Sequence, residues 1–132
     1  MIVDASIAFK WIFVEQGSEA ATALIGREDL RAPSFLLAEI GNAMWKKALR
    51  GELGDRGAYS AQISLIGSLI DLVDEAPDIP RALEMAVTLD HPIYDCIYLA
   101  VAERFDEPFV TGDSKFAVKA RSSPFAERIR TT

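Results

Sequence analysis

The sequence has very little of the two residue types on which many hydrolases depend. Cys96 is the only cysteine and His91 the only histidine among 132 residues. A single cysteine excludes an internal disulfide, which fits a reducing cytoplasm. A single histidine excludes ribonuclease mechanisms that use two histidines, and the lack of cysteine pairs excludes the usual zinc sites.

The short motifs of other enzyme classes are also missing. There is no Walker loop, no G-x-G-x-x-G fingerprint and no G-x-S-x-G nucleophile elbow. The segment Asp4–Ser6 has a serine where the motif of a phosphoaspartyl phosphatase has its second aspartate, which argues against that class of enzyme. Cys96 and His91 could form a thiol–imidazole pair, but the apolar stretch around Cys96 favours a buried core thiol.

Long apolar runs are absent as well. No stretch reaches the roughly 18 apolar residues of a membrane span. The segment from Met1 to Val14 is apolar, but it lacks a basic start and contains Asp4, so we expect no signal peptide. No repeat or Pro/Gly/Ser-rich linker divides the chain. We therefore expect one cytoplasmic domain over residues 1–132, without membrane contact.

The charge is negative overall and unevenly spread. A net charge of −6 argues against a protein that binds nucleic acid only by neutralising phosphates. From Lys115 to the end, however, the chain has five basic residues and one acidic residue. An acidic body with a basic end suits a protein that gathers a cation at one place and phosphates beside it. Ordinary solvated charges would give the same composition.

The order of predicted elements indicates an α/β fold. We expect strands at 1–3, 31–32, 71–74, 108–111 and 126–131, the last at an edge of the sheet. We expect helices at 7–14, 18–25, 35–50, 55–69, 80–89, 92–105 and 114–120, with Ser6 and Ser34 capping the first and third. Short apolar strands alternating with helices are typical of a three-layer α/β/α sandwich around a central, mainly parallel sheet.

Four of the twenty acidic residues stand out by their surroundings. Asp4 and Asp113 follow apolar strands, at the sheet edge where sites form in such folds. Glu39 and Asp95 lie in helical stretches that are otherwise free of charge. Carboxylates near a core are costly unless they are paired or bind a metal. Because oxygen ligands suit Mg²⁺ or Mn²⁺, the pattern predicts a metal site formed by these four acids.

Each acid also has a purely structural interpretation. Asp4 can end its strand in an Asx turn, and Asp113 can cap the following helix. Glu39 and Asp95 lie in the first turns of helices, where a negative charge complements the helix dipole. The occurrence of two of them at the strand ends of one sheet favours the functional interpretation.

Four segments resemble, in the same order, the motifs of PIN-domain ribonucleases. The third match is the most specific, and together the matches span nearly the whole chain. The length and the single-domain build resemble those of VapC toxins from bacterial and archaeal toxin–antitoxin pairs. The four segments are Val3–Ser6 with Lys10–Trp11, Pro33–Glu39 with Asn42–Ala43, Tyr94–Glu103, and Thr111–Asp113.

The resemblance implies a Mg²⁺- or Mn²⁺-dependent endoribonuclease, a homodimer, and a cognate antitoxin that blocks the site. Asp4 and Asp95 would hold the metal, while Glu39 or Asp113 would complete its shell or orient the attacking water. In-line attack on the phosphodiester would then leave a 5′-phosphate and a 3′-hydroxyl. Some family members have one more acid shortly after the fourth motif. This chain has Ser114–Phe116 there, so the resemblance does not extend to a second metal.

Several residues are assigned supporting roles. Ser6 and Thr111 are candidate donors that fix the carboxylates, or else a helix cap and a strand-end residue. Lys46, Lys115 and Lys119 are candidates for holding RNA over the metal. The alternative function is a PIN-like module that binds RNA or protein without physiological catalysis.

The first predicted helix is apolar on more than one face, through Phe9, Trp11, Ile12 and Phe13. One face must meet the sheet. The other face either meets an antitoxin or a second subunit, or is buried within the domain.

Overall fold

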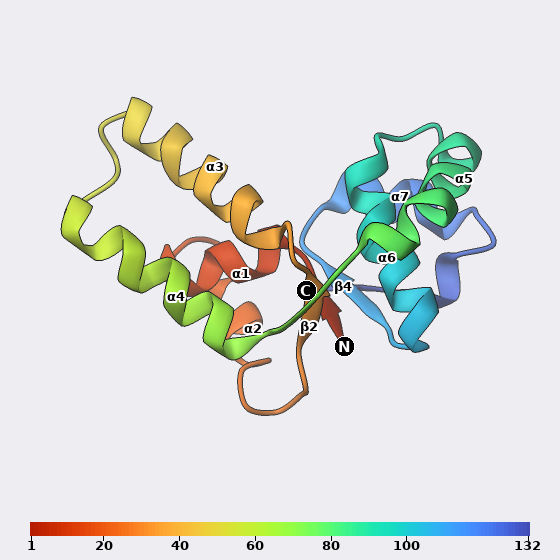
Figure 1. Cartoon of the computed structure of the whole chain (residues 1–132), viewed down its shortest axis with the longest axis horizontal. Coiled ribbons are helices and arrows are strands. Elements are labelled where there is room, and N and C mark those ends of the chain that lie inside the picture. The colour runs from red at the N-terminus through yellow and green to blue at the C-terminus, as the bar shows by residue number, and fades with distance from the viewer.

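Five parallel strands form the centre of the protein in a computed structural model that describes all of residues 1–132. Their order in the sheet is β3-β2-β1-β4-β5, and every neighbouring pair is parallel. Helices cover both faces of the sheet (Figure 1), so the predicted three-layer α/β/α architecture is confirmed. The strands are β1 (Ile2–Val3), β2 (Arg31–Pro33), β3 (Asp71–Val73), β4 (Phe109–Thr111) and β5 (Ile129–Thr131).

The helices divide into two groups along the chain. Figure 1 shows α1 to α4 on one side of the sheet and α5 to α7 on the other. The helices are α1 (Ala5–Ile12), α2 (Ser18–Thr22), α3 (Leu36–Leu49), α4 (Tyr59–Leu69), α5 (Ile79–Leu89), α6 (Ile93–Phe105) and α7 (Ser114–Arg121), with short 3-10 turns η1 (Arg56–Ala58), η2 (Ala76–Asp78) and η3 (Ala126–Arg128).

None of these helices combines the length and the apolar composition that a membrane crossing requires.

One continuous hydrophobic core includes residues of the strands and of the helices that cover them, which is why the strands are apolar. Ile2 and Val3 of β1 are fully buried, because helices cover both faces of this central strand. Helix α6 is buried from Cys96 to Ala102, which confirms the prediction of a core thiol. The ring of Tyr98 stacks on Phe109 of β4 at a centroid distance of 5.7 Å. This packing fixes α6 against the strand that leads to Asp113.

Two predicted helix caps are wrong, and long-range contacts give the reason. Helix α1 begins two residues earlier, because the Asp4 carboxylate accepts from the amide of Ile7 at 3.2 Å. Ser6 instead donates to Asp4 and accepts from the amide of Gly112, far along the chain. Ser34 donates to Glu75 at 2.7 Å, and α3 has no side-chain cap.

The order of the strands determines where a site can form. Strand β1 lies between β2 and β4, so the residues that follow these strands meet at one edge. Asp4 follows β1, Thr111 ends β4, and Asp113 comes two residues later. This carboxyl edge is where open parallel α/β sheets bind ligands.

Candidate active site

Asp4 is the most deeply buried acid of this edge, with 4% of its surface exposed. The hydroxyls of Ser6 and Thr111 donate to its two carboxylate oxygens, each at 2.5 Å. Burial raises the pKa of Asp4 to about 6, although these hydrogen bonds and the Ile7 amide lower it and the charge of Asp95 raises it. The structure therefore holds a carboxylate where its negative charge is costly. The predicted contacts of Ser6 and Thr111 with this acid are present.

Asp113 is joined to Asp4 through Thr111. The Thr111 hydroxyl oxygen accepts from the amide of Asp113 at 2.9 Å while its proton is donated to Asp4. Asp113 also caps α7, because its Oδ1 accepts from the amides of Lys115 and Phe116. The cap that the sequence offered as a structural interpretation is thus present. It uses one oxygen only, and Oδ2 makes no hydrogen bond within the protein.

Glu39 reaches the edge from the first turn of α3. Its Oε1 accepts from the hydroxyl of Tyr98, which is buried in α6, at 2.5 Å. Burial raises the pKa of Glu39. The Tyr98 hydrogen bond lowers it, and the negative charges of Asp95 and Asp4 raise it. Glu39 is therefore held in place by one residue and repelled by two others.

Asp95 lies in the first turn of α6 and contacts the only histidine. The Nε2 atom of His91 lies 2.6 Å from its Oδ2. Burial raises the pKa of Asp95, the His91 hydrogen bond lowers it, and the charge of Asp113 raises it. His91 itself is mostly buried, packs against Phe116 with ring centroids 5.0 Å apart, and has no partner for its Nδ1.

These four acids influence one another although they come from four different elements. The charge of Asp95 raises the pKa of Asp4, and the charges of Asp4 and Asp95 both raise the pKa of Glu39. The charge of Asp113 raises the pKa of Asp95. No three histidine, cysteine, aspartate or glutamate side chains converge closely enough to hold a metal ion as they are arranged here. The donor set nevertheless fits a hard divalent cation, because it consists of carboxylate oxygens that repel one another.

Three residues near the acids were not predicted to belong to the site. His91 and Tyr98 hold Asp95 and Glu39, as described above. The third is Lys10 of α1. Its ammonium group lies close to Gly112: a Cβ atom placed on this glycine would be 3.2 Å from Lys10 Nζ and 3.0 Å from Ser6 Oγ. The ammonium group therefore reaches the loop before Asp113.

The sequence contains little signal for these three contacts. His91 precedes Asp95 by four residues, a spacing that joins side chains within a helix, but His91 lies before α6 begins. Tyr98 meets Glu39 across 59 positions of the chain, which no local pattern indicates. Lys10 is four residues from Ser6 on α1, and it belongs to the segment that resembles the first motif of the family.

The predicted RNA-binding lysines lie in different surroundings. Lys46 lines a surface hollow together with Glu39. Lys115 is exposed in the first turn of α7, next to Asp113. Lys119 is exposed as well, and its ammonium donates to the backbone carbonyl of Asp90 at 2.7 Å.

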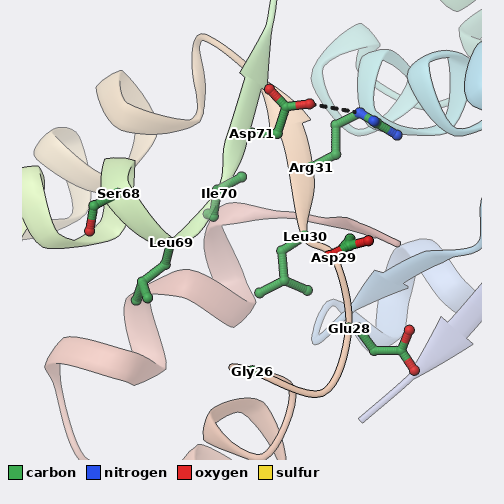
Figure 2. A pocket seen from close by; sticks show the side chains of 9 residues that line it. All are labelled: Gly26, Glu28, Asp29, Leu30, Arg31, Ser68, Leu69, Ile70 and Asp71. Carbon is green, nitrogen blue, oxygen red and sulfur yellow. Dashed lines mark hydrogen bonds and ion pairs between the residues drawn. The ribbon is translucent and has the colours of Figure 1, made fainter.

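A larger hollow, of about 590 Å³, opens at the opposite edge of the sheet (Figure 2). It lies where β2 and β3 begin, and an ion pair of 3.2 Å between Arg31 and Asp71 crosses its upper side. Ligands of open parallel sheets bind at the carboxyl ends of the strands rather than at these amino ends. The carboxylate edge is therefore the candidate active site, despite the greater volume here.

Comparisons with known proteins identify the family. The PIN domain family model matches residues 1–122. Ribonuclease VapC1 of Mycobacterium tuberculosis is 36% identical over 65% of this chain, and the match covers 64% of the length of that relative. Ribonuclease VapC3 and Exonuclease VapC9 of Pyrobaculum aerophilum are 27% and 30% identical, over 90% and 74% of this chain and 93% and 71% of their own lengths.

A solved structure gives the same answer for the fold. The crystal structure of PAE2754 from Pyrobaculum aerophilum superposes with a TM-score of 0.76 at 24% sequence identity, covering 98% of this chain and 87% of that chain. The family model and the named relatives identify the family, and the solved structure shares the fold. This chain therefore belongs to the PIN-domain family and is similar to VapC proteins.

Proposed function

We propose that the protein is a Mg²⁺- or Mn²⁺-dependent endoribonuclease and the toxin of a toxin–antitoxin pair. The observation that carries the proposal is the carboxylate edge, where burial raises the pKa values of Asp4, Glu39 and Asp95 beside Asp113. Protein folds keep such costly charges together mainly where chemistry requires them. Relatives that are named ribonucleases add support, although those names describe other proteins.

In this proposal Asp4, Glu39, Asp95 and Asp113 hold the divalent cation. When bound, such a cation polarises the phosphoryl oxygen and lowers the pKa of water at the site. Asp113 has an oxygen free for this purpose, because only its Oδ1 caps α7. Cation binding would also relieve the mutual repulsion that raises the pKa values of its neighbours.

The remaining polar contacts orient the carboxylates. Ser6 and Thr111 fix both oxygens of Asp4, and His91 fixes one oxygen of Asp95. Tyr98 fixes Oε1 of Glu39 and leaves its other oxygen to accept a proton from the attacking water. Partners of this kind commonly set the orientation and basicity of metal-binding groups.

Basic side chains would hold the substrate against an acidic protein. Lys46, Lys115 and Lys119 lie on the surface around the carboxylate edge, on α3 and α7. In this proposal each of them pairs with a phosphate of single-stranded RNA. Lys10 reaches the loop before Asp113 and contacts the phosphate nearest the cleaved bond.

The proposal includes a cognate antitoxin and a homodimer. Most of α1 packs within the domain, since Phe9, Trp11, Ile12 and Phe13 are partly buried against the core. Large apolar side chains are exposed instead at Trp45, Leu49 and Leu65 on α3 and α4, and along α5. Exposed apolar groups of this extent favour contacts with other chains. We assign the α3–α4 surface to the antitoxin and the α5 surface to the second subunit.

The test is cleavage of a mixed pool of linear and circular RNAs with Mg²⁺, with Mn²⁺, and with a chelator. An endoribonuclease opens circular RNA, whereas an exonuclease of the kind named among the relatives degrades only the linear molecules. Asp95→Asn should reduce cleavage at least a hundredfold, because the carboxylate charge is lost. Asp55→Asn, which changes an exposed acid that caps η1, should leave the rate unchanged.

The alternative is a PIN-like module that binds RNA or protein without catalysis. It predicts RNA binding that is insensitive to Asp95→Asn, and no metal-dependent product with any RNA. A product that appears only with Mg²⁺ or Mn²⁺, and disappears in Asp95→Asn, excludes it.

A further inference from the structure

One face of α3 continues the carboxylate edge along the surface of the protein. Glu39, Asn42 and Lys46 are spaced by three and four residues, so they lie in a row on this helix. The first turn of α6 faces the row and places Tyr94 opposite it. These residues line a hollow of about 490 Å³.

The walls of this hollow are aromatic and its rim is polar. Tyr94 directly precedes Asp95, and 63% of its surface is exposed. Its ring lies 6.4 Å from that of Phe35, centroid to centroid, in a tilted arrangement. Phe35 in turn packs on the buried ring of Tyr98 at 5.1 Å. One aromatic wall is therefore rigid, and the other presents a free face to solvent.

The position of the hollow relative to the acids restricts what it can bind. Glu39 belongs both to the carboxylate edge and to the lining of the hollow. Lys46 lies seven residues further along α3, which corresponds to about 10 Å of helix rise. An aromatic surface therefore lies between a carboxylate site and a single positive charge.

We propose that this hollow is a nucleobase subsite, in which a base next to the cleaved phosphodiester stacks on Tyr94. This inference rests on the function proposed above. The phosphate beyond that base would pair with Lys46, and the amide of Asn42 would bind the polar edge of the base. Stacking on aromatic side chains and a basic groove are the two features by which proteins bind single-stranded nucleic acids. An apolar protein side chain would leave the polar groups of Glu39 and Asn42 without partners.

The test compares two oligonucleotides of equal charge, a 12-nucleotide single-stranded RNA and the abasic ribose-phosphate chain of the same length. Both are measured without divalent cations, so that no cleavage occurs. The wild type should bind the RNA more tightly than the abasic chain. Tyr94→Ala should weaken RNA binding by on the order of tenfold and leave binding of the abasic chain unchanged. Tyr94→Phe, which keeps the ring, should restore the preference.

Two further variants separate stacking from charge and from unfolding. Lys46→Ala should weaken binding of both oligonucleotides alike and reduce the salt dependence by a slope of about 0.7, as for one lost phosphate contact. Trp45→Ala removes an exposed aromatic residue from α3 that does not line the hollow, and it should change neither affinity. Because Tyr94 is exposed, its variants should melt within a few degrees of the wild type.

The subsite is overturned if Tyr94→Ala keeps the wild-type preference for RNA over the abasic chain. If, in addition, sedimentation shows that Tyr94→Ala converts a dimer into a monomer, the hollow is a contact between two copies of the chain instead. Either result leaves metal-dependent cleavage intact. Failure of the nuclease proposal itself would instead appear as uncleaved circular RNA.

Discussion

At the scale of single residues, the most informative feature is the cost of ionising the site. Burial raises the pKa of Asp4 to about 6 and raises those of Glu39 and Asp95 as well. Folded protein therefore keeps protons that the unfolded chain has already released. Its free energy of unfolding must fall as the pH rises through this range.

The first prediction concerns Asp4→Asn. From the ordinary value of 3.8 to the folded value of about 6, ionised Asp4 costs the folded state roughly 3 kcal/mol. The variant avoids this cost, but its amide must rearrange the hydrogen bonds with Ser6 and Thr111. We expect it to be about 1–2 kcal/mol more stable than the wild type at pH 7. Near pH 4 the wild-type carboxyl is protonated, so only the cost of the rearranged hydrogen bonds remains and the variant should be about 1 kcal/mol less stable.

Urea unfolding at pH values from 4 to 7 measures this difference. The exposed acid of Glu28→Gln serves as the control and should track the wild type throughout. A constant difference between Asp4→Asn and the wild type at all pH values would contradict the assignment. Added Mn²⁺ should stabilise the wild type more than Asp4→Asn, because it binds only the folded state.

The second prediction concerns the hydrogen bond between Tyr98 and Glu39. Tyr98→Phe keeps the buried ring but removes the contact that lowers the pKa of Glu39. The pKa of Glu39 should therefore rise further, and the acid limb of the cleavage rate should move to higher pH. A loss of about 1 kcal/mol in stability should accompany it. Tyr59→Phe, whose hydroxyl lies 3.5 Å from the Gly54 carbonyl, should leave the pH profile where it is. An unchanged profile in Tyr98→Phe would show that Glu39 does not limit the rate.

At the scale of secondary-structure elements, sequence patterns predicted the strands, the helices and the Asp113 cap, but the predicted caps of α1 and α3 were wrong. Apolar runs and helical spacing reveal burial, which local residues determine. The caps of α1 and α3 depended on Gly112 and Glu75, which lie 106 and 41 positions from Ser6 and Ser34. Both serines are good caps in isolation, so only the tertiary contacts decide between the alternatives.

In the candidate site, too, local sequence reveals some residues and only tertiary contacts reveal the others. Asp4, Glu39, Asp95 and Asp113 could be picked out because each is an acid within an apolar local sequence. The topology of a parallel sheet then predicts that the two at strand ends lie together. His91, Tyr98 and Lys10 could not be picked out, because their importance depends on which side chain each one meets.

The third prediction concerns how α6 is attached to the turn before α5. Asp78 is 5% exposed and pairs with Arg104 of α6 at 3.0 Å. Burial raises the pKa of Asp78 and the Arg104 charge lowers it. Arg104→Met leaves this carboxylate buried without a cation, and should cost about 1–3 kcal/mol in stability at pH 7.

Thermal melting of matched variants checks this. Arg81→Met breaks ion pairs that are more exposed, with Glu84 and Glu103, and should cost less than about 1 kcal/mol. The cost of Arg104→Met should shrink in acid, as Asp78 becomes protonated. Equal costs for the two variants would show that burial of Asp78 does not matter to the pair.

At the scale of the whole molecule, exposed apolar groups are concentrated on particular elements. Ile79, Leu83 and Val87 are spaced by four on α5 and are 38%, 56% and 75% exposed. Such a stripe on the outside of a helix normally faces another chain. It lies on the opposite side of the sheet from Trp45, Leu49 and Leu65 (Figure 1).

The fourth prediction is that Leu83→Glu yields a monomer. A charge in the middle of an apolar contact between subunits would be buried without a partner. Sedimentation equilibrium should show the wild type as a dimer and Leu83→Glu as a monomer, with Leu65→Glu on α4 remaining dimeric. Dissociation by Leu65→Glu instead would place the subunit contact on the α3–α4 surface.

The hydrogen bond from Thr111 to Asp4 joins residues 107 positions apart, and the order of protein synthesis gives this distance a meaning. A ribosome produces Asp4 well before it produces Asp95, Thr111 and Asp113. Strands β1, β2 and β3 can pair while β4, which must lie directly beside β1, has not yet been made. A chain released before β4 by interrupted translation would therefore carry three of the five strands, and Asp4 would lack its contact with Thr111. The cell would meet an intact carboxylate edge only after the chain had been extended past Asp113.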